Sequence, residues 1–428
     1  MSNCKEMLCV VGIVLFGVIG CGHAESIRIG LNYPQTGPYS VQGKAQLDAA
    51  QMAVEEINDQ GGILGRTVKL ITRDTQSKPD VSTQNVLELI DKENCEMIFG
   101  GSSSAVAIAG GKAAKSRGKL YFGTLTYSNS TTGTEGHKYM FRECYNAYMG
   151  AKALGKYLVK MKLQGIKYFY ITADYTWGRT TEESIRTFSL TTDAKRHRRH
   201  YVPFPGATYK DLSTALSWAK AVKPAVLVLV LFGKDMSRAL TMLQENGMKD
   251  QLKLIVVPNL TLGMAKEAGA EAMEGVLGAL PWAWNVPYKY DYPQGKKFVE
   301  KFSAIYNSYP STSAASAYTI LYQYKEAVER AKTFDSKKVI SALEGHTFVS
   351  LKDEQQWRAF DHQALQTVYT VRGKPADEVG RDKFKQDYFE ILYKMDGEKA
   401  ARTKDQWRKF EKKRDARRSL NFKSSFWC

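Results

Sequence analysis

The apolar and polar positions between residues 27 and 75 follow two different periods. Ile27–Leu31 alternates residue by residue, which predicts a short strand. From Lys44 onward the apolar residues fall on one face of a helix, with charged residues on the other. Val68–Thr72 alternates again and predicts a second strand. A strand, a helix and a strand in this order predict a parallel pair with a right-handed crossover.

Further along the chain, short apolar runs predict the strands of a larger structure. Ala225–Leu231 is so apolar that both of its faces must be buried, as in a parallel sheet that helices cover on each side. Because such runs alternate with helical patterns, they predict an α/β fold. The other runs are Cys95–Phe99, Leu120–Leu125, Ile166–Thr172 and Leu252–Val257.

The loop after the first strand is the first candidate for a ligand site. Ligands of open α/β sheets bind at the carboxyl ends of the strands, and residues 32–43 lie at such an end. Thr36–Pro38 marks a turn in this loop, and Tyr39 follows the turn directly. We therefore expect Tyr39 to contact a ligand.

Several motifs follow one another in a fixed order along the chain. They are Thr36–Pro38, Gly43, Ile57–Asp59, Gly61–Arg66, Asp74–Gln76, Gly100–Ala107 and Arg358–Gln363. In this order they resemble bacterial solute-binding proteins of the Leu/Ile/Val-binding type, which are receptors of ABC transporters. The resemblance covers about residues 27–395.

The resemblance implies two Rossmann-like α/β lobes, each a mostly parallel sheet flanked by helices, joined by three crossing strands. By family position, residues 27–145 and 283–360 form the first lobe, and residues 146–282 and 361–395 form the second. Such lobes close like a hinge on a small polar ligand. The resemblance further implies delivery of the ligand to an inner-membrane ABC permease, no catalytic step, no cofactor, and a monomer.

In the first lobe, the serines before an Ala-rich helical pattern are the main candidates. Serine hydroxyls cap the free N–H groups at a helix N-terminus, and the same N–H groups bind carboxylate or phosphate. From the residues alone, an ordinary N-cap explains the pattern about as well. By resemblance, Ser104 binds the carboxylate of the ligand with Ser103 beside it, while Thr126 and Tyr127 add hydroxyl, main-chain or stacking contacts.

In the second lobe, Asn259 stands where amino-acid binders of this family tend to carry an acid for the ammonium of the ligand. A carboxamide donates and accepts, so it favours a neutral polar group such as an amide or urea. Asp235 is an alternative acid, although a charged residue at a helix start is more often a cap. Two other ligand classes also stay open: aromatic or aliphatic carboxylates, and branched-chain amino acids whose ammonium is bound in a different way. The remaining candidates near the crossings and in the second lobe are Tyr148, Tyr175, Trp177, Phe232 and Trp282.

Motifs of the common enzyme classes are missing from the sequence. It contains no GxSxG elbow, no P-loop and no HExxH, and its six histidines have no metal-ligand spacing. Ser102–Ser104 has no local base, but a triad partner can be remote in sequence. A secreted hydrolase therefore stays as an alternative, as does a ligand-sensing receptor domain of the same fold. We interpret Asp361 and His362 as a hydrogen-bonded structural pair at the third crossing.

The net charge of +17 raises the question of nucleic acid or an anionic membrane. No recognisable nucleic-acid motif accompanies the basic cluster Lys195–His200 or the basic tail 396–428. A solvated basic surface is therefore the favoured interpretation. The expected export of the protein also argues against nucleic acid as a partner, because a signal peptide would carry the protein away from it.

Residues 1–24 have the pattern of a signal peptide. Leu8–Gly20 is uninterrupted and apolar, too short to span a bilayer but of the length of a signal-peptide core. This pattern predicts a periplasmic protein. The flanking residues leave open whether Cys21 is lipidated or the mature protein is freely soluble. In such an oxidising compartment Cys95 and Cys144 could form a disulfide.

Overall fold

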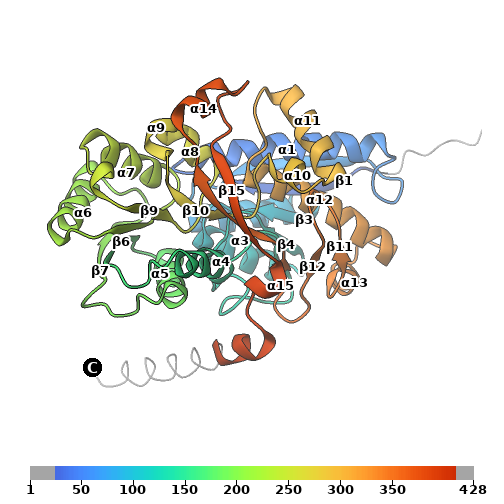
Figure 1. Ribbon diagram of the computed structural model, residues 1–428. Coiled ribbons are helices and arrows are strands. Elements are labelled where there is room, and N and C mark those ends of the chain that lie inside the picture. The colour runs from blue at the N-terminus through green and yellow to red at the C-terminus, as the bar shows by residue number, and fades with distance from the viewer. Residues whose placement is uncertain (1–24, 411–428) are drawn as a thin grey trace, which may run out of the picture.

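The computed structural model describes residues 25–410, which form two α/β lobes (Figure 1). The expected signal segment, including Cys21, and the end of the expected tail lie outside the described residues. Within the described part of the chain, no helix is long and apolar enough to cross a membrane.

The first lobe is built on a five-stranded parallel sheet with the strand order β2-β1-β3-β4-β5. Its strands are β1 (Ile27–Tyr33), β2 (Val68–Asp74), β3 (Cys95–Gly100), β4 (Leu120–Gly123) and β5 (Met140–Arg142). The crossover helices are α1 (Ser40–Asp59), α2 (Pro79–Asp91) and α3 (Ser104–Ser116). The predicted parallel pair is thus β1 and β2, which run in register from Ile27 beside Val68.

Helix α1 begins earlier than its apolar pattern indicates because Gly43 lets its first turn approach the preceding loop. A Cβ on Gly43 would lie 2.0 Å from the carbonyl oxygen of Pro34. The glycine of the N-terminal motif therefore has a packing reason. It brings the polar first turn of α1 down to the carboxyl edge of the sheet.

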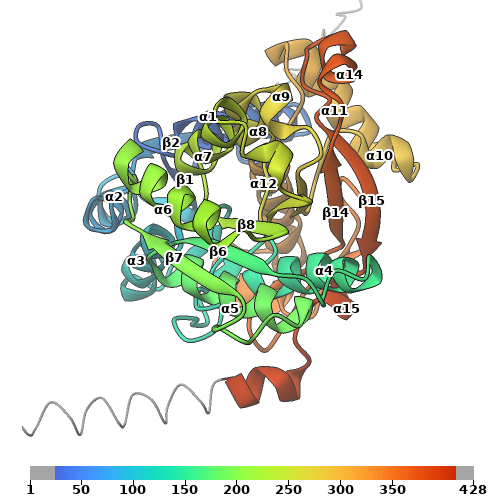
Figure 2. The same ribbon diagram turned by 60° about the vertical axis from the view of Figure 1, so that its left-hand side comes forward.

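The second lobe is built on a seven-stranded sheet with the order β15-β14-β10-β9-β8-β6-β7. The pairs from β10 to β7 are parallel, while β14 and β15 are antiparallel additions along one edge (Figure 2). The strands are β6 (Tyr168–Ala173), β7 (Arg198–Val202), β8 (Val226–Val230), β9 (Leu254–Val257), β10 (Leu277–Leu280), β14 (Val368–Gly373) and β15 (Phe389–Met395).

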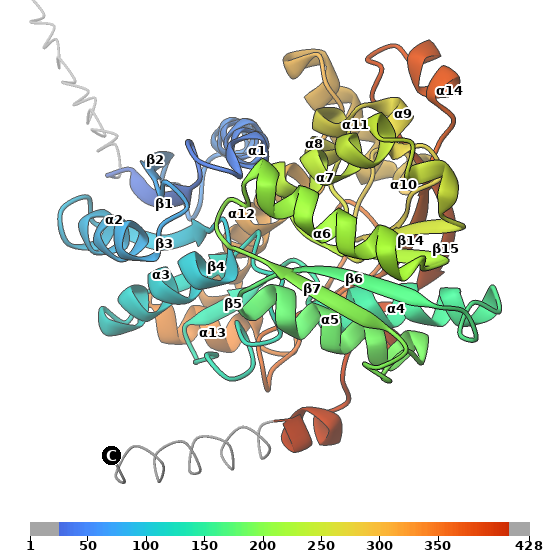
Figure 3. The same cartoon turned by 90° about the vertical axis from the view of Figure 1, so that its left-hand side faces the viewer.

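Most of the remaining helices flank this second sheet, with α6–α9 lying opposite α2 and α3 of the first lobe in Figure 3. They are α4 (Ala147–Lys160), α5 (Thr176–Ser189), α6 (Tyr209–Val222), α7 (Lys234–Glu245), η1 (Lys249–Gln251), α8 (Leu262–Ala268), α9 (Ala270–Met273), α14 (Ala376–Arg381) and α15 (Gly397–Ala400).

After β10 the chain returns to the first lobe, where α12 packs along α1. A small three-stranded antiparallel sheet completes this part, and its Trp357 and Ala364 belong to the core of the first lobe. The elements are α10 (Val286–Lys289), α11 (Pro293–Tyr306), α12 (Thr312–Ala331), α13 (Ser336–Leu343), β11 (Thr347–Phe348), β12 (Gln355–Trp357) and β13 (Ala364–Leu365).

The three passages between the lobes follow β5, β10 and β13. The third passage lies at Gln366–Thr367, whereas the expected boundary is residue 360. Residues 361–364 stay with the first lobe because Arg142 of β5 forms a parallel bridge with Gln363 and Ala364 packs into the first core.

One sequence expectation is wrong in detail, and one question that the sequence left open is answered. Asp361 and His362 do not pair with each other: Asp361 accepts from the Arg358 guanidinium, while His362 lies 2.8 Å from Glu344 and stacks on Phe141. Cys95 and Cys144 are both buried free thiols, so they form no disulfide in this structure.

Candidate functional site

The serines of the first lobe lie at the N-terminus of α3, which follows the carboxyl end of β3. Ser103 is the N-cap, and its Oγ accepts from the Val106 N–H at 3.4 Å. Ser104 Oγ accepts from the Ser128 N–H at 3.0 Å and so joins α3 to the next loop. Both hydroxyls are almost fully buried. The two interpretations of the serine pattern are therefore compatible, since a capping serine lies at the edge where ligands of such sheets bind.

Arg142 holds the neighbouring loop that carries Thr126 and Tyr127. Its fully buried guanidinium donates to the carbonyl oxygens of Thr126, at 3.0 Å, and Ser128, and to Gln363 Oε1 at 2.7 Å. Burial without a directly bonded carboxylate lowers the pKa of Arg142 to about 10. Arg142 therefore positions the loop main chain, a role for which the sequence contained no pattern.

Aromatic side chains from both lobes meet between the sheets. Around Phe232, the ring centroids of Tyr39, Tyr127 and Trp177 lie at 5.5, 5.8 and 5.9 Å. Tyr145 lies 5.4 Å from Tyr127. We call this set the interlobe aromatic cluster; its full membership is Tyr39, Tyr127, Tyr145, Tyr175, Trp177, Phe204 and Phe232.

The lobes approach each other most closely where Gly233 meets the loop before α1. Gly233 has a φ of +61°, and a Cβ there would lie 2.7 Å from the Tyr39 ring and 2.8 Å from the carbonyl oxygen of Pro38. A side chain at this position would separate the two loops. The structure is therefore closed at this point of the interlobe region, with Tyr39 of the first lobe against Phe232 of the second.

Three polar groups at or beside the cluster are buried and have no hydrogen-bond partner among residues 25–410: Asn259 Nδ2, Tyr127 Oη and Trp177 Nε1. The other amide atom of Asn259 is used, since Tyr145 Oη donates to its Oδ1 at 2.7 Å. Burial raises the pKa of Tyr127 well above its ordinary value, so its hydroxyl stays protonated. All three groups can thus donate a hydrogen bond, and leaving them unpaired is costly.

Asp235, the alternative acid, is engaged within its own lobe. Its carboxylate accepts from the Ala207 N–H at 3.1 Å, which holds the segment that carries Phe204. Phe204 in turn stacks on Tyr175 with ring centroids 3.6 Å apart. Burial raises the pKa of Asp235, as expected for a carboxyl that supports a loop in the interior.

Two of the expected contact residues lie apart from the cluster. Tyr148 packs under the C-terminal segment, by which we mean residues 402–410. The Arg402 guanidinium lies 4.0 Å from the ring centroid of Tyr148. Trp282 lies in the core of the first lobe and donates its indole N–H to the carbonyl oxygen of Pro310 at 3.1 Å. The structure brings together the other nine: Ser103, Ser104, Thr126, Tyr127, Tyr39, Tyr175, Trp177, Phe232 and Asn259.

Sequence reasoning missed Tyr145 and Phe204. Phe204 follows β7, whose basic residues concealed a strand that runs parallel to β6. Had β7 been recognised, the rule that ligands bind at carboxyl ends would have indicated Phe204. Tyr145 lies at the first passage between the lobes, and nothing in the sequence distinguishes it from other tyrosines.

Among residues 25–410, no three His, Cys, Asp or Glu side chains are grouped so that they could hold a metal ion. The polar groups of the site are instead hydroxyls, amides and an indole. This set suits reversible binding of a small organic ligand.

Comparison with solved structures shows the same fold elsewhere. A periplasmic binding protein from Burkholderia mallei superposes with a TM-score of 0.79 at 23% identity, covering 89% of this chain and 97% of that one. A solute binding protein from Rhodopseudomonas palustris BisB5 in complex with 3,4-dihydroxybenzoic acid gives 0.75 at 18%, covering 87% and 98%. An isoleucine complex of a branched-chain amino acid transporter substrate binding protein from Streptococcus pneumoniae gives 0.70 at 19%, covering 86% and 99%.

Sequence comparison identifies the family of the chain. Leu/Ile/Val-binding protein homolog 7 of Brucella abortus is 25% identical over 341 residues, which cover 75% of this chain and 81% of the relative. The family model described as periplasmic binding protein matches residues 26–378, most of the two lobes. The chain therefore belongs to the periplasmic binding protein family, whose members bind solutes.

Proposed function

We propose that this protein captures a small organic acid or amide between its two lobes in the periplasm and delivers it to an ABC permease. Family membership supports the capture of a solute. The relatives named for Leu/Ile/Val binding and the similar ABC-transporter receptors support the transport role. We also infer that the protein acts as a monomer and catalyses no reaction.

The observation that carries the ligand class is the set of unpaired donors at the interlobe aromatic cluster. Asn259 Nδ2, Trp177 Nε1 and Tyr127 Oη can all donate to an acceptor such as a carboxylate or carbonyl oxygen. Asp235, in contrast, supports the Phe204 segment. The site therefore favours an acceptor over an ammonium group.

The aromatic rings favour a flat or apolar body for the same ligand. Rings pair well with other rings at centroid distances of about 4.5–7 Å. Two Rhodopseudomonas palustris proteins of this fold were solved with 3,4-dihydroxybenzoic acid and with benzoate. The proposed ligand is thus a planar carboxylate or amide, with Ser104 and the Thr126–Tyr127 loop on one side and Asn259 and Trp177 on the other.

A calorimetric panel on the purified full chain tests this ligand class. The panel holds benzoate, benzamide, urea, leucine and isoleucine, and the protein is first unfolded and refolded to remove any ligand carried through purification. We expect heat and a raised unfolding temperature with benzoate or benzamide, and neither with the two amino acids. Tight binding of leucine or isoleucine alone would overturn the inference that the site favours a hydrogen-bond acceptor over an ammonium group.

The state of the N-terminus needs its own measurement. We infer that residues 1–24 act as an export signal, with two alternative ends: a lipidated Cys21 or a free N-terminus shortly after it. Intact-mass spectrometry of the protein from the periplasmic and membrane fractions distinguishes the two. A mass increased by a diacylglyceryl group and a chain beginning at Cys21 identify the lipoprotein.

A further inference from the structure

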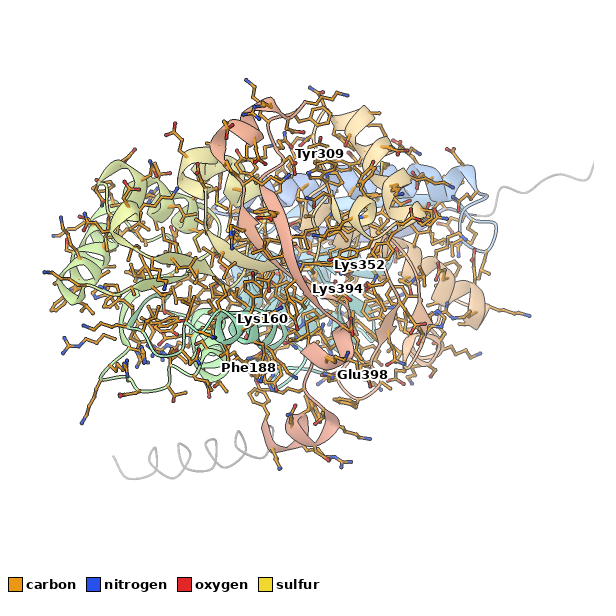
Figure 4. All side chains as sticks on the ribbon, viewed as in Figure 1. Lys160, Phe188, Tyr309, Lys352, Lys394 and Glu398 are labelled. Carbon is orange, nitrogen blue, oxygen red and sulfur yellow. The ribbon has the colours of Figure 1, made fainter. Side chains whose placement is uncertain are left out.

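A groove of about 380 Å³ lies between the lobes, apart from the interlobe aromatic cluster. Residues 41–48 of α1 line one side, residues 262–266 of α8 line the other, and residues 302–311 close one end, where Tyr309 lies at the top of the view in Figure 4. None of the eleven expected ligand residues lines this groove. It is therefore a separate feature, and the expected ligand does not explain it.

The charges that line the groove are unbalanced. Lys44 and Asp48 form an ion pair at 2.8 Å and neutralise each other. Lys266 lies at the rim with its Nζ 3.5 Å from Ser308 Oγ, and within the described residues it forms no ion pair. The lining thus has one cation in excess, which favours an anion.

Gln42 adds a hydrogen-bonding group on the α1 side of the groove. The residue is almost fully buried, and its Nε2 lies 3.5 Å from Thr261 Oγ1. Its Oε1 has no hydrogen-bond partner in the part of the chain that the structure describes. A half-turn of the amide would let Oε1 accept from the Thr261 hydroxyl and free the two Nε2–H donors. Gln42 can therefore offer an N–H group to a ligand without losing its contact to the second lobe.

The rest of the lining is largely apolar. Val41, Leu262 and Phe302 come from three different helices and leave room for a hydrocarbon chain between them. A cation and an amide beside such walls suit a molecule with one charged end and one apolar end.

We propose that this groove is a second small-molecule site, which binds an amphipathic monocarboxylate such as a medium-chain fatty acid. Lys266 and the amide of Gln42 hold the carboxylate, and Val41, Leu262 and Phe302 cover the chain.

The two lobes each contribute one wall, so the site is complete only in the closed arrangement. A monocarboxylate bound there stabilises closure and, by linkage, strengthens binding of the transported ligand. This coupling rests on the proposed function, whereas the site itself does not.

Gly263 gives a second way to test whether both lobes form the walls of the site. A Cβ on Gly263 would lie 2.9 Å from Val41 Cγ1 and 3.1 Å from Gln42 Nε2. A valine at this position would push α8 away from α1 and so widen the groove. A Cβ on Gly165 would meet no atom within 4 Å, so the same substitution there is a matched control.

Calorimetric titration of the refolded full chain with octanoate tests the site. We expect saturable binding that Lys266→Met weakens by about tenfold, the loss of one charge-assisted hydrogen bond. Gly263→Val weakens it as well, while Lys210→Met on exposed α6 and Gly165→Val leave it unchanged. Unfolding temperatures of all four variants show that each is folded.

Two outcomes overturn the proposal. One is the absence of octanoate binding to the wild type, which leaves the solute-binding function untouched. The other is binding that Lys266→Met leaves intact and Asn259→Ala abolishes, which would place octanoate in the interlobe aromatic cluster and so support that site instead.

Discussion

The Lys352 ammonium donates to the carbonyl oxygen of Pro281 at 2.6 Å and thereby joins the first lobe to the second passage between the lobes. The same ammonium reaches Gln366 Oε1 at 2.8 Å and the carbonyl oxygen of Thr367 at 3.1 Å, both in the third passage. Gln366 Nε2 then donates to the carbonyl oxygen of Glu143 in the first passage. One buried lysine and one amide therefore connect all three passages near the middle of the molecule (Figure 4).

Replacing this lysine should destabilise the whole chain. Lys352→Met leaves two carbonyl oxygens and an amide oxygen without their donor in the interior, and removes the cation beside Glu143. We expect the free energy of unfolding to fall by about 2 kcal/mol. Leaving three buried acceptors without a donor costs more than the variant gains by no longer burying a charge. Urea unfolding measures this fall. Lys337→Met on the exposed face of α13 is the control, with a change within about 0.5 kcal/mol.

The same lysine predicts a pH dependence with a definite sign. Burial lowers the pKa of Lys352 from 10.5 to about 8, and the neighbouring Asp353 and Glu143 only partly oppose this. At pH values between about 8 and 10.5, the unfolded chain binds more protons than the folded one. The free energy of unfolding of the wild type therefore rises with pH over this range. We expect the stability difference between wild type and Lys352→Met to widen from pH 8 to pH 10, by about 2 kcal/mol. A difference that narrows over this range would contradict the assignment.

Arg142 should be required for the shape of the loop that carries Thr126 and Tyr127, as well as for stability. Arg142→Lys keeps a positive charge but cannot reach Thr126, Ser128, Thr132 and Gln363 together, as the planar guanidinium does. We expect a loss of about 2–4 kcal/mol in unfolding free energy and weaker ligand binding in the folded fraction. Arg372→Lys in β14, which is only half-buried, is the control. Unchanged affinity in a destabilised variant would limit Arg142 to a role in stability.

Asn259 offers a test of specificity. Asn259→Asp keeps the oxygen to which Tyr145 donates at 2.7 Å, but replaces the unpaired donor with a second acceptor. We expect binding of a planar carboxylate to weaken by at least about tenfold, since two like charges meet in a dry site. Leucine or isoleucine, with an ammonium group, should bind better than to the wild type. Asn246→Asp on the surface after α7 is the matched control. If both ligand classes respond alike, Asn259 does not contact the ligand.

The fold could be predicted further than the site because its signals are local. Buried strands such as Val226–Val230 are apolar on both faces, and Gly43 marks a close approach that any helix in this position needs. The small sheet around Trp357 was missed because strands of two or three residues have no period to detect. In the site, Ser104 and Trp177 follow strands that the pattern revealed. Arg142 and Tyr145 act through contacts between distant segments, which only the folded chain shows.

The C-terminal segment bridges the lobes and should limit their movement. The Arg402 guanidinium lies 4.0 Å from the ring centroid of Tyr148 at the start of α4, while the Arg402 carbonyl oxygen accepts from Arg358 at 2.6 Å. Trp407 packs edge-on against Phe360 of the first lobe at 5.4 Å. Because these contacts span the first and third passages, releasing the segment should make opening of the lobes easier.

Trp407→Ala removes the largest of these contacts. We expect unfolding free energy to fall by about 1 kcal/mol, as for an aromatic side chain that is only partly buried. Hydrogen exchange of residues 402–410 and of the first turn of α4 should become faster, with exchange in β8 unchanged. The matched control is Trp218→Ala on α6, whose side chain is 54% exposed. Faster exchange throughout both lobes would show a general loss of stability instead, and unchanged exchange around Tyr148 would show that the segment does not restrain the passages.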